Sequence, residues 1–237
     1  MAPFPTSGSL CSEVMRVKSS GRFKDRRKQR GPRTIETREP RCETFLIVSE
    51  GTRTEPLYFE GLVRALAKGE VPNEVEIEGV GRVTTSLVEW TAKRVNRSPR
   101  NYDNVWVVFD RDDFENFDEA VTAAERSGFC AAWSNESFEY WLCLHLGRYD
   151  SALSRGDWFR ILNDALKKSG YGGFEKNRED LFSVLDKMGS RNMAKRNARS
   201  IREGYGKAAP PSQCNPCTTV DLLVEQLERS LDGWVDH

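Results

Sequence analysis

Two short apolar runs of the sequence each end in acidic residues. Residues 45–48 lead through a serine to Glu50, and residues 105–109 lead directly to Asp110 and then Asp112. Apolar runs of this length are typical of buried strands. The carboxyl ends of such strands form the edge at which open parallel sheets bind ligands. We therefore expect the three acidic side chains to lie at one edge of a sheet.

The spacing of Asp110 and Asp112 suits a bound metal ion. If strand geometry continues to Asp112, both side chains leave the backbone on the same side, and Arg111 points away. Glu50 would add a third carboxylate, and carboxylate oxygens are the ligands that Mg²⁺ or Mn²⁺ prefers. Three such groups repel one another without a cation. Glu50, Asp110 and Asp112 are therefore candidate metal ligands, in a site that could bear the charge of a phosphoryl group.

Simpler explanations remain open for the same residues. Acidic residues at strand ends often cap the next helix, and residues 110–113 could form a solvated loop. The Asp-x-Asp spacing is short, and it also occurs in phosphotransferases with an aspartyl nucleophile and in nucleotide-sugar transferases. Spacing alone therefore does not choose between a metal site and a structural role.

Strands and helices are expected to alternate up to about residue 146, with helices beyond it. The periodicity of apolar residues predicts strands at residues 44–49, 75–80, 105–109 and 129–133. It predicts helices at residues 55–68, 84–96, 117–128, 138–145, 157–169, 175–188, 190–203 and 218–231. Thr52 and Glu55 match a capping box for the first helix. This pattern predicts an α/β fold, a mostly parallel sheet flanked by helices with a helical C-terminal part.

The net charge of zero hides an uneven distribution. Residues 1–42 contain 11 Lys and Arg against 4 Asp and Glu, a net charge of 11 − 4 = +7, so the remainder carries 25 − 32 = −7. This segment has no apolar period, and we expect a flexible basic arm that either contacts phosphate-rich partners or aids solubility. The predicted domains are this arm, an α/β core at 43–146 and a mainly helical subdomain at 147–237.

A second basic feature lies in the helical C-terminal part. Lys187, Arg191, Lys195 and Arg199 are spaced by four residues, which would form a stripe on one helix face suited to a nucleic-acid backbone. A break at residues 189–190 and pairing with acidic neighbours are the alternative. The chain has no G-x-x-x-x-G-K-[ST] motif, so it does not itself resemble an ATPase.

Other candidate ligands give weaker signals. Cys214 and Cys217 form a lone C-x-x-C pair, whereas a closed zinc site needs four ligands. His145 shares an apolar helix face with Phe138 and Trp141, which favours a core histidine over a ligand or base. No apolar run is long enough for a membrane helix, so we expect a protein of the cytoplasm.

Three motifs in this order resemble the RloB-like family. They lie at residues 47–59, 105–112 and 134–145, and the late Asn215-Pro216-x-Thr218 also fits. More broadly, a strand ending in Glu-Gly and, about sixty residues later, a strand ending in Asp-x-Asp resemble the Toprim domain of type IA topoisomerases, bacterial primases and OLD-type nucleases. The resemblance implies a Toprim-like, Rossmannoid sheet.

The resemblance also implies roles for individual residues. Glu50 would act as general acid or base, and Asp110 and Asp112 would bind Mg²⁺. Asn135 and Glu139 fall in the family's Ser-Asn-Pro-x-Phe-Glu motif and would contact substrate or assist catalysis. The sequence departs from this motif at one position, where Glu136 replaces the proline, and this puts the placement of Asn135 in doubt.

The expected function follows from the same resemblance. The family is associated with restriction and abortive-infection loci and often accompanies an AAA/ABC-type ATPase. We therefore expect a Mg²⁺-dependent nuclease of RNA, tRNA included, or of DNA, acting in anti-phage defence beside such an ATPase. Assembly as a homo-oligomer stays open. The alternatives are a non-catalytic module that regulates the ATPase and a nucleotidyl or phosphoryl transferase.

Overall fold

A five-stranded sheet lies at the centre of the described protein. The structure, a computed structural model, describes residues 43–82, 84–112, 116–206 and 208–231. The strand order is β2-β1-β3-β4-β5, in which β1 to β4 are parallel and β5 is antiparallel. The strands are β1 (Phe45–Ser49), β2 (Val75–Gly79), β3 (Asn104–Asp110), β4 (Cys130–Asn135) and β5 (Cys217–Thr218). The mostly parallel sheet predicted from the alternating pattern is confirmed.

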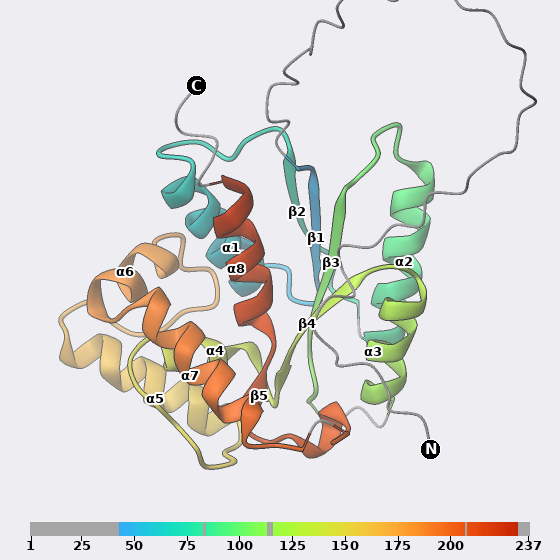
Figure 1. The fold of residues 1–237 in the computed structure, drawn as a ribbon. Helices are drawn as coiled ribbons and strands as arrows, with labels where there is room; N and C mark the ends of the chain where they lie inside the picture. The colour runs from blue at the N-terminus through green and yellow to red at the C-terminus, as the bar shows by residue number, and fades with distance from the viewer. Residues whose placement is uncertain (1–42, 83, 113–115, 207, 232–237) are drawn as a thin grey trace, which may run out of the picture. The chain divides into compact units, whose positions relative to one another are not determined.

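Helices cover both faces of this sheet (Figure 1). Those before β4 are α1 (Thr54–Leu66), α2 (Thr84–Arg97) and α3 (Phe117–Arg126). Those after β4 are α4 (Phe138–Leu144), α5 (Arg155–Lys168), α6 (Leu181–Met188), α7 (Arg191–Glu203) and α8 (Val220–Leu231), with a 3₁₀ turn, η1 (Pro211–Gln213), before β5. The helical C-terminal part is therefore also as predicted.

Successive side chains of β1 point alternately into the two layers of the core. Phe45 and Ile47 pack with residues of α1 and of the C-terminal helices, whereas Leu46 and Val48 pack with α2 and α3. Successive side chains of a strand point to opposite faces, so a strand covered on both faces must be apolar throughout. All four side chains are fully buried, which explains the uninterrupted apolar run.

The strand order reverses direction between β1 and β3, which makes a topological switch point there. From β1 the chain passes through α1 to β2 at one edge, and from β3 it passes through α3 to β4 on the other side. Helices α1 and α3 pack in different core layers, on opposite faces of the sheet. In open parallel sheets this arrangement leaves a crevice at the carboxyl ends of the two strands. Glu50 and Asp110 lie at those ends.

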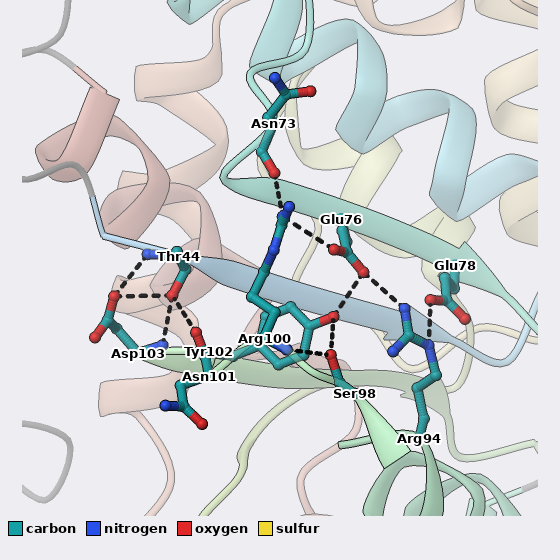
Figure 2. A network of polar contacts seen from close by, with 10 residues as sticks. All are labelled: Thr44, Asn73, Glu76, Glu78, Arg94, Ser98, Arg100, Asn101, Tyr102 and Asp103. Carbon is teal, nitrogen blue, oxygen red and sulfur yellow. Dashed lines mark hydrogen bonds and ion pairs between the residues drawn. The ribbon is translucent and has the colours of Figure 1, made fainter. Parts of the chain in front are cut away.

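Polar contacts hold the opposite, amino ends of the strands and the edge strand β2 (Figure 2). Arg94 of α2 donates to Glu76 and to Glu78 of β2, each at 2.7 Å. Next to β1, the backbone N–H and the hydroxyl of Thr44 donate to the Asp103 carboxylate at 2.9 and 2.8 Å, which joins the start of β1 to the start of β3. The network thus fixes α2 on the edge strand and the amino ends of two central strands.

One predicted helix cap and two predicted element boundaries were wrong. Helix α1 begins at Thr54 with Arg53 at its N-cap and no side-chain capping bond, so Thr52 and Glu55 form no capping box. The helix predicted from residue 175 begins only at Leu181. Before it, the Arg178 guanidinium donates to Asp180 at 2.6 Å and to the carbonyl of Tyr171 at 2.6 Å, which holds that segment in turns.

The second boundary concerns the last predicted helix, at 218–231. Cys217 and Thr218 instead pair with Asn135 and Ser134 as β5, and α8 begins at Val220. The Thr218 hydroxyl donates to the carbonyl of Trp133 at 2.9 Å. This two-residue strand is too short to produce a periodic signal in the sequence.

The described residues from Glu43 onward belong to one compact unit, in which β5 completes the sheet and α8 packs on it. The predicted division into a core at 43–146 and a subdomain at 147–237 stays a prediction. The arm predicted for residues 1–42 lies outside the described residues. Within the described chain, no helix combines the length and apolar character needed to span a membrane.

Candidate active site

A cleft of about 380 Å³ lies at the carboxyl ends of β1 and β3. Its lining includes the segment 50–55 after β1, Asp110 from β3, Glu139 from α4, Arg155 from α5, and Lys176 from the loop before α6. The cleft therefore coincides with the switch point of the sheet. Of the predicted catalytic residues, Glu50, Asp110 and Glu139 line it directly.

Glu50 is held by backbone bonds to both neighbouring strands. Its N–H donates to the carbonyl of Val108 in β3 at 2.9 Å, and its own carbonyl accepts from Gly81, after β2, at 3.0 Å. These bonds continue the sheet one residue beyond β1. Hydrogen bonds to the sheet therefore fix the backbone position of Glu50.

Asp110 is the last residue of β3, and its side chain is almost entirely buried, at 7% exposure. Burial, followed by the nearby charge of Glu55, raises its pKa well above the usual range, although the cation of Arg155 opposes the rise. Glu139 and Asp112 raise the pKa further. Several acidic groups therefore act on one carboxylate that has little access to water.

Asp112 reaches the same place by a different geometry from the one predicted. The strand ends at Asp110, and Asp112 has a left-handed backbone with φ of 40°, so the expected alternation does not place it. Aspartate is one of the residues that tolerates this conformation. Its carboxylate nevertheless lies 3.0 Å from Nη1 of Arg155, whose Nη2 contacts Asp110.

Glu55 belongs to the site and was missing from the predicted ligand set. It lies in the first turn of α1 and is 6% exposed. Burial and the charge of Glu139 raise its pKa, against hydrogen bonds from the backbone of Glu55 itself and of Gly51. A Cβ at position 51 would overlap the Glu55 carboxylate, so a larger residue there would require that side chain to shift. The glycine after Glu50 therefore permits this close approach of Glu55.

Glu139 is placed by the first turn of α4 and is 3% exposed. Its Oε2 lies 3.9 Å from Nε of Arg155 and makes no hydrogen bond within the described residues. This placement brings a carboxylate from a fourth element to the cleft. The motif resemblance, rather than helical periodicity, pointed to it.

Arg155 is the cation that contacts these acidic groups, and sequence reasoning missed it. It is the first residue of α5, where Ser154 and Asp157 form a capping box that fixes the helix start. Its guanidinium contacts Asp110, Asp112 and Glu139. The capping box is visible in the sequence. No local pattern, however, connects Arg155 to Asp110, which lies 45 residues earlier.

The donor set suits a hard divalent cation in its chemistry. Carboxylates from β1, α1, β3 and α4 meet at the cleft, and the pKa of Asp110 and Glu55 is raised there. A divalent cation would relieve that repulsion. Among the described residues, however, no three His, Cys, Asp or Glu side chains already have the arrangement of a metal site. Arg155 occupies the oxygens of Asp110 and Asp112 instead.

Comparison with protein families matches one description, the RloB-like protein, over residues 45–227 of the 237-residue chain. The chain belongs to the RloB-like family. The match spans β1 through most of α8 and therefore includes every element that lines the cleft. Comparisons with curated proteins and with solved structures found no match.

Asn135 of this RloB-like chain lies outside the cleft lining. It is the last residue of β4, its side chain is fully buried, and its amide donates to the carbonyls of Pro211 and Ser212, each at 3.2 Å. In this position it connects β4 to η1. Contact of Asn135 with substrate stays a prediction, and its observed bonds indicate a structural contribution.

The basic stripe predicted for the RloB-like chain is divided and paired. Lys187 lies at the end of α6, and the other three residues lie on α7, beyond Gly189 and Ser190. Arg191 and Lys195 form ion pairs with Glu228, and Arg199 pairs with Glu225, both on α8. Arg202 pairs with Asp221 in the same row. Nucleic-acid contact by the stripe stays a prediction that we do not carry further, because α8 supplies partners for three of its four cations.

The remaining candidate ligands lie in the core. Cys143, Cys214 and Cys217 are free thiols and buried. His145 is fully buried, and its Nε2 lies 3.0 Å from the hydroxyl of Tyr58. This position agrees with the core histidine that its helical spacing predicted.

Burial of His145 has a consequence for acid stability. Burial, together with the nearby charge of Arg191, lowers the pKa of His145 to about 3. The unfolded chain takes up this proton near pH 6.5, so it binds more protons than the folded state between pH 6.5 and 3. The His145 contribution to the free energy of unfolding should therefore fall by about 1.4 kcal/mol for each pH unit below 6.5.

The measurement is denaturant unfolding at several pH values for the wild type and His145→Gln. We expect the variant to have a shallower loss of stability between pH 6.5 and 4.5. The control is His237→Gln, the other histidine of the chain. An unchanged slope in His145→Gln would show that this residue does not titrate as its burial requires.

Proposed function

We propose that this RloB-like protein is a Mg²⁺-dependent nuclease whose active site is the cleft at the ends of β1 and β3. The observation that carries the proposal is the convergence of Glu50, Glu55, Asp110 and Glu139 at the switch point of a parallel sheet. Burial raises the pKa of two of them, Asp110 and Glu55, and such groups in a cleft are characteristic of functional sites.

Asp110, Asp112 and Glu50 would hold the metal, which would supply charge stabilisation for a phosphoryl group and orientation of the attacking water. Glu50 is assigned the transfer of a proton to or from the reacting oxygen. Its backbone is fixed by bonds to Val108 and Gly81, as a group that must meet a reacting atom requires. Glu55 and Glu139 add negative charge that favours the bound cation.

The cationic side chains beside the acidic groups favour a nuclease over other metal-dependent enzymes. Arg155, Lys176 and Arg53 line the same cleft. Lys and Arg next to a carboxylate-bound Mg²⁺ are a common arrangement for phosphodiester or phosphoanhydride chemistry. The family association with defence loci extends the proposal to an anti-phage effector that acts beside an AAA/ABC-type ATPase, in the cytoplasm.

The test is direct incubation of the purified chain with total RNA and with plasmid DNA in Mg²⁺, with and without the ATPase encoded nearby. We expect cleavage of one substrate that EDTA abolishes. Glu50→Gln should retain the wild-type melting temperature and lose the activity. Equal cleavage by the wild type and Glu50→Gln would refute the assignment of the cleft.

One observation favours a second candidate, a non-catalytic module that binds and regulates a partner ATPase. Arg155 already contacts Asp110, Asp112 and Glu139, which could make the acidic cluster a structural ion-pair network. Calorimetry with Mn²⁺ separates the two functions. Binding heat that disappears in Asp110→Asn supports the nuclease, and the absence of such heat in the wild type supports the module.

A further inference from the structure

Arg155 occupies the oxygens that the proposed metal site needs. Its guanidinium contacts Oδ2 of Asp110 and lies 3.0 Å from Oδ2 of Asp112, the two aspartates assigned to the metal. A divalent cation that binds Oδ2 of both aspartates would use the same two oxygens that the guanidinium contacts. Arg155 and the metal therefore compete for one place.

The surroundings of Arg155 allow it to leave that place. Its side chain is 40% exposed and lines the cleft, and within the described residues its contacts are those with the three carboxylates. Its Nε makes no hydrogen bond there. The capping box of Ser154 and Asp157 fixes the backbone of α5 independently of the guanidinium. Movement of the side chain would thus cost no other bond of the described fold.

Once the metal has displaced it, the Arg155 guanidinium could bind a phosphodiester in this cleft. Arginine binds phosphate oxygens in a bidentate manner and keeps its charge at every relevant pH. Lys176, from the loop before α6, lines the same cleft and adds a second cation. The acidic residues and the cations would then bind the metal and the substrate phosphate side by side.

We propose, on the basis of the nuclease function above, that Arg155 is the phosphate-binding residue of the site and is held on the metal-binding carboxylates until metal displaces it. In the metal-free protein it balances the charge of Asp110 and Asp112. When the cation takes these oxygens, the guanidinium turns to the substrate phosphate. Binding of metal and binding of nucleic acid therefore strengthen each other.

The experiment measures metal and nucleic-acid binding separately in the full chain. Mn²⁺ affinity is measured by calorimetry for the wild type, Arg155→Gln, Arg155→Lys and Asp110→Asn. The second probe is a phosphorothioate oligonucleotide of about 12 nucleotides, as RNA and as DNA, which limits cleavage, titrated with and without Mn²⁺. Arg160→Gln is the matched control, because Arg160 lies on the same helix, is exposed, and pairs with Asp157 away from the cleft lining.

We expect Arg155→Gln to bind Mn²⁺ about fivefold more tightly, because a partly exposed competing cation is removed. Its affinity for the oligonucleotide in Mn²⁺ should fall about tenfold, as for loss of a charged hydrogen bond. Arg155→Lys should keep near wild-type Mn²⁺ affinity but lose most of the oligonucleotide affinity, because lysine cannot bind in a bidentate manner. Arg160→Gln should match the wild type in both.

These measurements distinguish failure of the Arg155 proposal from failure of the nuclease proposal. If the wild type binds Mn²⁺ in a manner that needs Asp110, but Arg155→Gln binds it no more tightly, this inference is wrong and the nuclease proposal stands. Unchanged oligonucleotide affinity in Arg155→Gln overturns the inference in the same way. If the wild type binds no Mn²⁺, the proposed function itself fails. Melting temperatures of all variants confirm that each is folded.

Discussion

Replacement of Asp110 by Asn is expected to abolish Mg²⁺-dependent cleavage and to stabilise the metal-free protein. The loss should be about 10³-fold or more, because a metal ligand supports several kcal/mol of charge stabilisation in the transition state. The gain in stability follows from burial and from the nearby Glu55, which raise the pKa of Asp110. Ionised Asp110 is thus disfavoured in the folded state at neutral pH, and an amide of the same shape removes that cost.

The gain in stability of Asp110→Asn should depend on pH. Because the folded-state pKa is raised, the folded protein binds the Asp110 proton more tightly than the unfolded chain, and wild-type stability due to this group falls as pH rises. At neutral pH we expect Asp110→Asn to increase the free energy of unfolding by about 1 kcal/mol. Toward acid pH the difference from the wild type should shrink.

The measurements are nuclease activity in Mg²⁺ and denaturant unfolding in EDTA. Asp164→Asn is the control, because Asp164 is exposed on α5 and its side chain contacts only the neighbouring Asn163 among the described residues. Wild-type activity in Asp110→Asn would remove this residue from the mechanism. A large loss of stability would instead show that its pairing with Arg155 outweighs burial.

Replacement of Arg202 by Ala should produce the largest loss of stability among the ion pairs between α7 and α8. Asp221 is fully buried, and the Arg202 guanidinium donates to both of its oxygens, at 2.6 and 2.7 Å. Arg202 also donates to the carbonyl of Thr218 in β5 at 2.7 Å. Removal of the cation leaves a buried carboxylate without its partner, and we expect the free energy of unfolding to fall by about 3–5 kcal/mol.

The control lies one turn earlier on the same helix. Arg199 is 54% exposed and pairs with Glu225, so Arg199→Ala should cost less than about 1 kcal/mol. A double variant, Arg202→Met with Asp221→Leu, should recover most of the stability, because it removes both charges together. Denaturant unfolding measures all three. A loss below about 1 kcal/mol in Arg202→Ala would mean that water reaches Asp221 in solution.

The Arg202 contacts bear on the site because β5 pairs with the end of β4. Thr218 and Cys217 pair with Ser134 and Asn135, just before the helix that carries Glu139. In turn, Asp110 pairs with Ser134 across the sheet. Loss of β5 should therefore loosen the edge of the sheet that holds the acidic residues, and activity of Arg202→Ala should fall together with its stability.

The sequence by itself determined the four parallel strands, most helices and two of the acidic positions. Phe45 to Val48 and Val105 to Phe109 are apolar on both faces because helices cover both faces, and this requirement is visible in each run alone. Glu50 and Asp110 follow from the same runs, because parallel strands end at a common edge. Belonging to the RloB-like family was also readable, since its motifs lie on these strand ends.

The tertiary structure alone decided which charges meet. Arg155 reaches Asp110 across 45 residues of chain, and Arg199 is neutralised by Glu225, 26 residues later on another helix. Periodicity reports only which face of an element is buried, so a basic stripe looks the same whether it faces water or an acidic helix. The contact between Arg155 and the acidic cleft therefore came from packing of α5 against α4, the helix that carries Glu139, and no local pattern encodes it.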